Sequence, residues 1–173
     1  SGSGDIYQIC PAFRDEMHSL WHKSQFLMLE WYRIGWDMKA VMDESSCFLQ
    51  SLHPLPIQYI DISQHLKSHF GITPKTSGCD IIAFANQAGF ESCDQVLSAY
   101  DFLIDCIIKQ SSKQDHWVLC AFYPDIMPAL AATKDNKAMR FEFYLNHIEV
   151  GHGYEELIDA DQAKKRFDRW HQE

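Results

Sequence analysis

Residues 140–157 read RFEFYLNHIEVGHGYEEL, and this stretch predicts a β-hairpin. Apolar and polar side chains alternate over residues 140–145, which is the pattern of a strand with one buried face. Asn146 and His147 fit a two-residue turn, because asparagine tolerates a positive φ. Such a turn sets a register of three cross-strand pairs, Leu145 with Ile148, Phe143 with Val150 and Tyr144 with Glu149.

The polar face of this hairpin carries two glutamates. In the predicted register Glu142 lies diagonal to Glu149, with backbones roughly 7–8 Å apart, a gap that the side chains can close. Two carboxylates at that separation repel each other unless a cation or a proton lies between them. Mg²⁺ is the hard cation that binds carboxylates together with phosphates. The pattern therefore predicts a metal site at Glu142 and Glu149, and the alternative is the solvated outer face of an ordinary hairpin.

The composition suits one globular domain, since 46% of the 173 residues are hydrophobic and 13% are aromatic. The net charge of −9 disfavours a surface that binds nucleic-acid backbones, which needs a basic stripe. None of the six cysteines forms a CxxC pair, which favours buried thiols of a reducing compartment over disulfides or a zinc site. No signal peptide or long apolar run is present, which predicts a soluble, cytoplasmic protein without membrane contact.

The other segments predict an α+β domain, an antiparallel sheet with helices packed against it. Strands are expected at residues 5–10 (continuing at 13–14), 26–34, 58–60 and 117–123. Helices are expected at residues 37–52, 61–70, 77–88, 93–110 and 159–172, and a loop at 124–136. Residues 34–115 are thus expected to be mainly helical, within a single domain that covers residues 1–173.

Residues 26–34, FLMLEWYRI, are apolar on both faces, which predicts a central strand covered on both sides. Phe26, Met28, Glu30 and Tyr32 share one of these faces. Burying Glu30 is costly unless it has a cationic or hydrogen-bonding partner. Glu30 is therefore a candidate ligand-binding residue, and a structural ion pair with a neighbouring arginine is an equal alternative.

Three stretches of this chain resemble the class II lysyl-tRNA synthetase family. Residues 13–33, with FRDE before a loop that contains His22 and FLMLEWYR after it, are similar to the family's second signature motif. Residues 140–160, RFEFYLNHIEVGHGYEELIDA, are similar to a later family stretch, and AFYPDIMPALAA at 121–132 is similar to its HFP…SLA segment. The MLEWYR match favours the elongation factor P lysine ligases, paralogs without an anticodon domain, over the synthetases proper.

The resemblance implies a class II synthetase-like fold with an adenylate-forming site that uses ATP and Mg²⁺. Arg14 would be the catalytic residue, because its planar fork suits both the α-phosphate and the substrate carboxylate. The implied ATP-binding residues are Arg14, Glu16, His22, Phe26, Glu142 and Glu149, and the last two would carry the metal. The implied contacts to a lysine-like amino acid are Glu30, Tyr32 and Glu156 for its amines, Tyr154 as a wall, and His152 where the family has Asn.

The chain is expected to be incomplete at both ends. The family's dimerisation motif would precede residue 1, so the homodimer that the resemblance implies would depend on residues outside this chain. The glycine-rich motif, whose arginine clamps the γ-phosphate, would follow Glu173.

The expected function is activation of lysine or a lysine isomer as an adenylate, followed by transfer to a lysine of elongation factor P. The alternatives are a non-catalytic binding module and part of a lysyl-tRNA synthetase. The acidic charge makes tRNA an unlikely acceptor.

Overall fold

Strands β1 (Ile6–Phe13) and β2 (Gln25–Tyr32) pair antiparallel in a two-stranded ribbon. The computed structural model describes residues 2–15, 23–91, 94–127 and 129–170. The ribbon belongs to a first unit, residues 1–36, and the remaining elements to a second unit, residues 37–173.

Two expectations for the ribbon are wrong. β1 runs unbroken through Pro11, which pairs with Leu27, because an edge strand can accommodate a residue that lacks an N–H donor. β2 was expected to be a central strand, but among the described residues it pairs with β1 alone, and Leu27 is 73% exposed. The apolar pattern on both faces of β2 is therefore not explained by burial within the described residues.

A five-stranded sheet forms the centre of the second unit. Its order is β3 (Ile57–Asp61), β4 (Trp117–Pro124), β6 (Lys137–Leu145) and β5 (Thr133–Lys134), with β7 (Ile148–Tyr154) also paired to β6. β3 runs parallel to β4 and the other pairs are antiparallel. The predicted α+β class is confirmed, although β5 lies where only a loop was expected.

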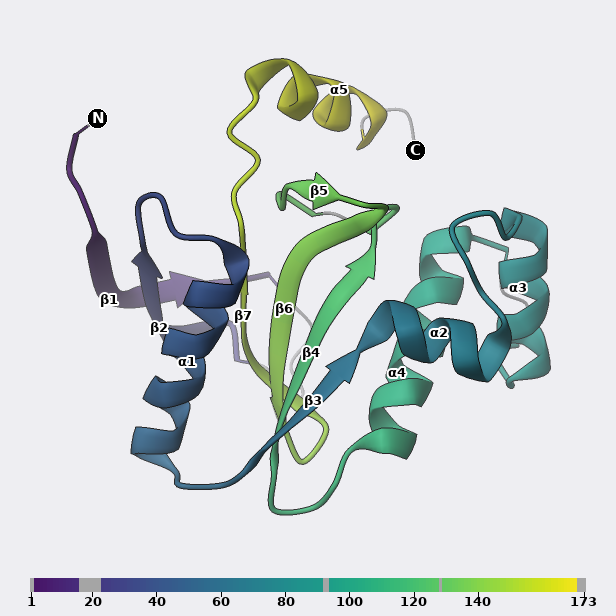
Figure 1. Ribbon diagram of the computed structural model, residues 1–173, viewed down its shortest axis with the longest axis horizontal. Coiled ribbons are helices and arrows are strands. Elements are labelled where there is room, and N and C mark those ends of the chain that lie inside the picture. Colours follow the sequence, from purple (N-terminus) through teal and green to yellow (C-terminus); the bar gives the residue numbers. More distant parts are fainter. Residues whose placement is uncertain (1, 16–22, 92–93, 128, 171–173) are drawn as a thin grey trace. The chain divides into compact units, whose positions relative to one another are not determined.

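Helices cover both faces of this sheet (Figure 1). On one face lie α2 (Ile62–Phe70), α3 (Gly78–Gln87) and α4 (Val96–Ser111), in a core that includes Val118 and Cys120 of β4. On the other face α1 (Met38–Leu52) packs with Leu119, Phe141 and Phe143. The helix α5 (Ala160–Trp170) is the last element along the chain. Among the described residues no helix has the length and apolar character needed to cross a membrane.

The helix ends follow from local sequence. Asp37, Asp61 and Ser77 are the N-caps of α1, α2 and α3, and each side chain accepts a backbone N–H. Gly71 ends α2 with a left-handed φ of 69°. The expectation of buried thiols is wrong for Cys47 and Cys79, which are exposed, whereas Cys120 is buried.

The predicted hairpin is present, but its register slips. Asn146 and His147 form the turn with φ values of 51° and 67°, and the pairs of Leu145 with Ile148 and of Tyr144 with Glu149 are confirmed. Phe143 pairs with Gly151 instead of Val150, because the pairing shifts between Phe143 and Tyr144.

The slip places Gly153 against a core aromatic, which gives a first prediction. A Cβ at Gly153 would lie 2.5 Å from the ring of Phe141, which is 2% exposed. Gly153→Ala is therefore expected to lower the free energy of unfolding by about 1–3 kcal/mol, as overpacking does. Urea denaturation measures this loss. Gly151→Ala is the control, because its Cβ would meet no atom within 4 Å, and an equal loss in both variants would contradict the prediction.

Candidate functional site

Glu142 lies in the middle of the β6 face that the sequence predicts to be polar, and it is only 6% exposed. Its carboxylate accepts hydrogen bonds from the Arg140 guanidinium and from the hydroxyls of Tyr123 and Tyr144. The alternative of a solvated outer face is therefore wrong for Glu142, whereas Glu149 is exposed. A buried carboxylate needs such partners, because an unpaired charge away from water is very costly.

The two tyrosine hydroxyls around Glu142 are held in their neutral, donating forms. Burial raises the pKa of the Tyr123 hydroxyl well above its usual value, and the charge of Glu142 adds to the shift. The same two causes raise the pKa of Tyr144. Cys120 pairs with Glu142 across the sheet, and burial raises the pKa of its thiol. Both tyrosines therefore stay protonated and donate to Glu142 at physiological pH.

Tyr123 reaches this cluster because β4 is irregular beside it. In a regular strand Tyr123 would share a face with Ala121, which packs on the α1 side. Phe122 has a left-handed φ of 59°, the pairing with β6 shifts there, and Tyr123 turns to the α4 side. The bulge is held by Ser63, whose hydroxyl donates to the Phe122 carbonyl at 2.6 Å, and by Lys137, whose ammonium lies 4.7 Å from the Phe122 ring centroid. Bulges often redirect a side chain beside a functional site.

A pocket of about 210 Å³ brings the two predicted metal ligands, Glu142 and Glu149, to one place. Tyr123, Arg140, Tyr144 and Met127 also line it, and α4 supplies Asp101, Ile104, Asp105 and Ile108.

Sequence reasoning missed the contribution of α4 to this pocket. Partial burial raises the pKa of the Asp101 carboxyl, and Arg140 opposes that shift. A signal for this wall was present, because Asp101 and Asp105 are four residues apart and flank the apolar stripe of the helix.

His152 and Tyr154 extend the same face along β7. His152 pairs with Glu142 in the register, and Tyr154 pairs with Arg140. The Nδ1 atom of His152 lies 3.0 Å from Oε1 of Glu149, and its ring stacks on Tyr154 with centroids 6.2 Å apart. The hydrogen bond to Glu149 raises the pKa of His152. His152 thus contacts a predicted metal ligand as well as a predicted substrate-pocket wall.

The raised pKa of His152 makes its contribution to stability depend on pH. A raised folded-state pKa means that the contribution is full below the unfolded value, near 6.5, and is lost as pH rises through the folded value. His152→Gln is therefore expected to cost more stability at pH 5.5 than at pH 8.5. The difference should stay below about 1 kcal/mol because the pair is half exposed. Urea denaturation at the two pH values tests this, and an equal cost at both would contradict it.

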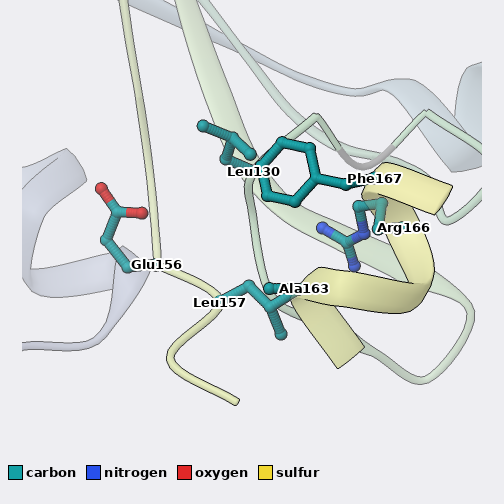
Figure 2. A pocket seen from close by; sticks show the side chains of 6 residues that line it. All are labelled: Leu130, Glu156, Leu157, Ala163, Arg166 and Phe167. Carbon is teal, nitrogen blue, oxygen red and sulfur yellow. The ribbon is translucent and has the colours of Figure 1, made fainter. Parts of the chain in front are cut away.

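Glu156 lines a second, smaller pocket of about 110 Å³. The other lining residues are Leu130, Leu157, Ala163, Arg166 and Phe167 (Figure 2). The Glu156 carboxylate points away from Phe167 and Arg166 in that view. Arg166 donates to the carbonyl oxygens of Ala129 and Ala131, at 3.0 and 2.6 Å. Glu156 is not among the residues of the Glu142 pocket, and its predicted contact with the substrate stays a prediction.

Three of the predicted site residues lie on one face of β2 in the first unit. Phe26, Glu30 and Tyr32 occupy alternate positions along β2, so their side chains lie on the same side of the strand. The Arg14 guanidinium lies 5.4 Å from the Phe26 ring centroid. Glu30 accepts a hydrogen bond from Nε2 of Gln8 at 2.6 Å, so an amide is one of its partners in the ribbon. Glu16 and His22 lie outside the described residues. The roles of all six residues, Arg14, Glu16, His22, Phe26, Glu30 and Tyr32, stay predictions.

The carboxylate pair has the chemistry that Mg²⁺ requires. Mg²⁺ is usually bound by one or two carboxylates together with waters and phosphates. Glu142 uses three of about four acceptor positions of a carboxylate for Arg140, Tyr123 and Tyr144, which leaves one for a metal. Within the described ranges no cluster of three or more metal-binding side chains occurs, so a cage made of protein alone is not found there. Glu142 and Glu149 thus fit a Mg²⁺ that keeps its other ligands from phosphate and water.

Comparison with known proteins places these residues in a family context. A family model described as tRNA synthetases class II (D, K and N) matches residues 1–173. Similar curated proteins are named elongation factor P--(R)-beta-lysine ligase. The one from Histophilus somni (strain 2336) is 32% identical, and the alignment covers 98% of this chain and 54% of that protein.

Two further relatives carry the same name. The Haemophilus ducreyi protein is 31% identical over 98% of this chain and 54% of its own length. The protein from Baumannia cicadellinicola is 30% identical over 96% of this chain and 54% of its own length. The chain thus spans about half the length of the curated relatives it matches.

Proposed function

Because this chain belongs to the class II tRNA synthetase family of the D, K and N enzymes, we propose that it is the core of a ligase for a lysine-type amino acid. In the first step a carboxylate oxygen of (R)-β-lysine or another lysine isomer attacks the α-phosphorus of ATP, and pyrophosphate leaves. In the second step the side-chain amine of a lysine in elongation factor P attacks the carbonyl carbon of the adenylate. An amide forms and AMP leaves. The names of the relatives support this acceptor and this amino acid.

The observation that carries the proposal is the meeting of Glu142 and Glu149 at one pocket. When bound there, Mg²⁺ would supply positive charge against the ATP phosphates. Arg140, Tyr123 and Tyr144 hold the Glu142 carboxylate in one orientation before any ligand arrives. Such preorganisation matters, because groups that need no rearrangement stabilise a transition state most effectively.

The ribbon of the first unit would bind the reacting ends of the substrates. Arg14 would contact the α-phosphate and the amino-acid carboxylate, and Phe26 would stack on adenine. The contact between the Arg14 guanidinium and the Phe26 ring supports this assignment, because it puts both groups on one side of the ribbon. Glu30 and Tyr32, on the same side, would hold the amines of the lysine-type substrate.

ATP–pyrophosphate exchange tests the first step, with the protein at its full natural length. Exchange that requires Mg²⁺ and (R)-β-lysine or lysine is expected. A protein that binds ATP but catalyses no exchange with any lysine isomer would instead be a non-catalytic binding module, and the proposal would fail.

Transfer to tRNA is the alternative that the family model supports, since its description names tRNA synthetases. Radiolabelled β-lysine offered with elongation factor P or with total tRNA distinguishes the two acceptors. We expect the label on the protein. The net charge of −9 supports this expectation, because an acidic surface repels a polyanionic acceptor.

A further inference from the structure

We propose that Tyr123 is a positioning residue, which holds Glu142 in the orientation that binds the metal. The inference rests on the proposed function and adds a residue that neither the sequence patterns nor the resemblance assigned to the site. Tyr123 is 2% exposed, and its hydroxyl lies 2.5 Å from Oε2 of Glu142. A donor that is fixed by packing restricts the rotation of the carboxylate it contacts.

Tyr123 also contacts the counterion of Glu142. The Arg140 guanidinium carbon lies 4.5 Å from the centroid of the Tyr123 ring, while the guanidinium itself bonds Oε1 of Glu142. One rigid side chain therefore supports both members of the ion pair, Glu142 with its hydroxyl and Arg140 with its ring face. Tyr144 donates to the same Oε2 atom, whereas Tyr123 combines this bond with the contact of its ring to Arg140.

The backbone beside Tyr123 is what brings it to Glu142. The left-handed φ of 59° at Phe122 is unfavourable for a bulky side chain, and it persists only where surrounding contacts fix it. Its effect is to turn Tyr123 from the α1 side of the sheet to the α4 side. Strained backbone of this kind concentrates at functional sites, and here its result is the hydroxyl on Glu142.

Tyr123→Phe tests the role, because it removes the hydroxyl and keeps the ring under Arg140. Mn²⁺ is the probe, since the electron paramagnetic resonance signal of the free ion reports binding without any reaction. We expect Mn²⁺ to bind about 10-fold more weakly, as is typical when a group that orients a metal ligand is lost. The Mg²⁺ concentration for half-maximal exchange should rise by the same factor.

Tyr59→Phe is the matched control. Tyr59 lies on the neighbouring strand β3, and its ring contacts Phe122 edge-on instead of Glu142. This variant should bind Mn²⁺ like the unaltered protein. Tyr123→Leu removes the ring as well, and it should weaken binding further than Tyr123→Phe.

Three outcomes would overturn the inference. Unchanged Mn²⁺ affinity in Tyr123→Phe would overturn it and leave the proposed function standing, provided that the unaltered protein catalyses exchange. Metal binding lost only together with the circular dichroism signal of the folded protein would show that the hydroxyl serves folding alone. An unaltered protein that neither binds Mn²⁺ nor exchanges pyrophosphate would overturn the proposed function and the inference with it.

Discussion

Replacing Glu142 by glutamine is expected to lower the rate of ATP–pyrophosphate exchange by about 10²–10³-fold, the loss typical of one electrostatic stabiliser. The amide has nearly the same shape as the carboxylate and still offers an oxygen to the hydroxyls of Tyr123 and Tyr144. It lacks the negative charge that a Mg²⁺ ligand provides. The exchange assay, at several Mg²⁺ concentrations, measures the loss.

Glu91→Gln is the control for this change. Glu91 is exposed in the connection between α3 and α4, so its loss removes one negative charge from the same unit without touching the pocket. Exchange should stay within about two-fold of the unaltered protein, as for most surface substitutions. Equal losses in the two variants would mean that net charge, and not a ligand at Glu142, governs the reaction.

The hairpin illustrates how much of the fold is local. The turn at Asn146 and His147 and the helix caps at Asp37 and Ser77 could be predicted, because each depends on residues close in sequence. The slip that pairs Phe143 with Gly151 could not, because it depends on how β7 lies against the core. Glycines inside β7 were the available signal, since a glycine within a strand often marks a bulge or a close contact.

The candidate site also combines residues that could be predicted from local sequence with one that could not. Glu142 and Glu149 could be placed together from alternation and turn geometry, and the pocket contains both. Tyr123 was missed because counting by two assigns it to the face of Ala121, and only the left-handed Phe122 reverses that assignment. That conformation depends on tertiary contacts from Ser63 and Lys137, which periodicity does not reveal.

Replacing Arg140 by methionine is expected to lower the free energy of unfolding by about 3–5 kcal/mol, the usual cost of leaving a buried charge without its partner. The side chains of Arg140 and Glu142 are 20% and 8% exposed, so water compensates little for the loss. Methionine keeps an unbranched apolar chain over the Tyr123 ring, which limits the loss of packing. Urea denaturation at pH 7 measures the change.

A double-mutant cycle separates the charge from the packing. Adding Glu142→Gln to Arg140→Met should restore about 2 kcal/mol, because no buried charge is then left unpaired. The exposed pair of Lys164 and Asp168 is the control, with side chains 74% and 56% exposed, and its cycle should give a coupling below about 1 kcal/mol. Strictly additive effects at Arg140 and Glu142 would mean that solvent already compensates the charge of Glu142. A metal would then gain little from this site, since its attraction to a solvated carboxylate is weak.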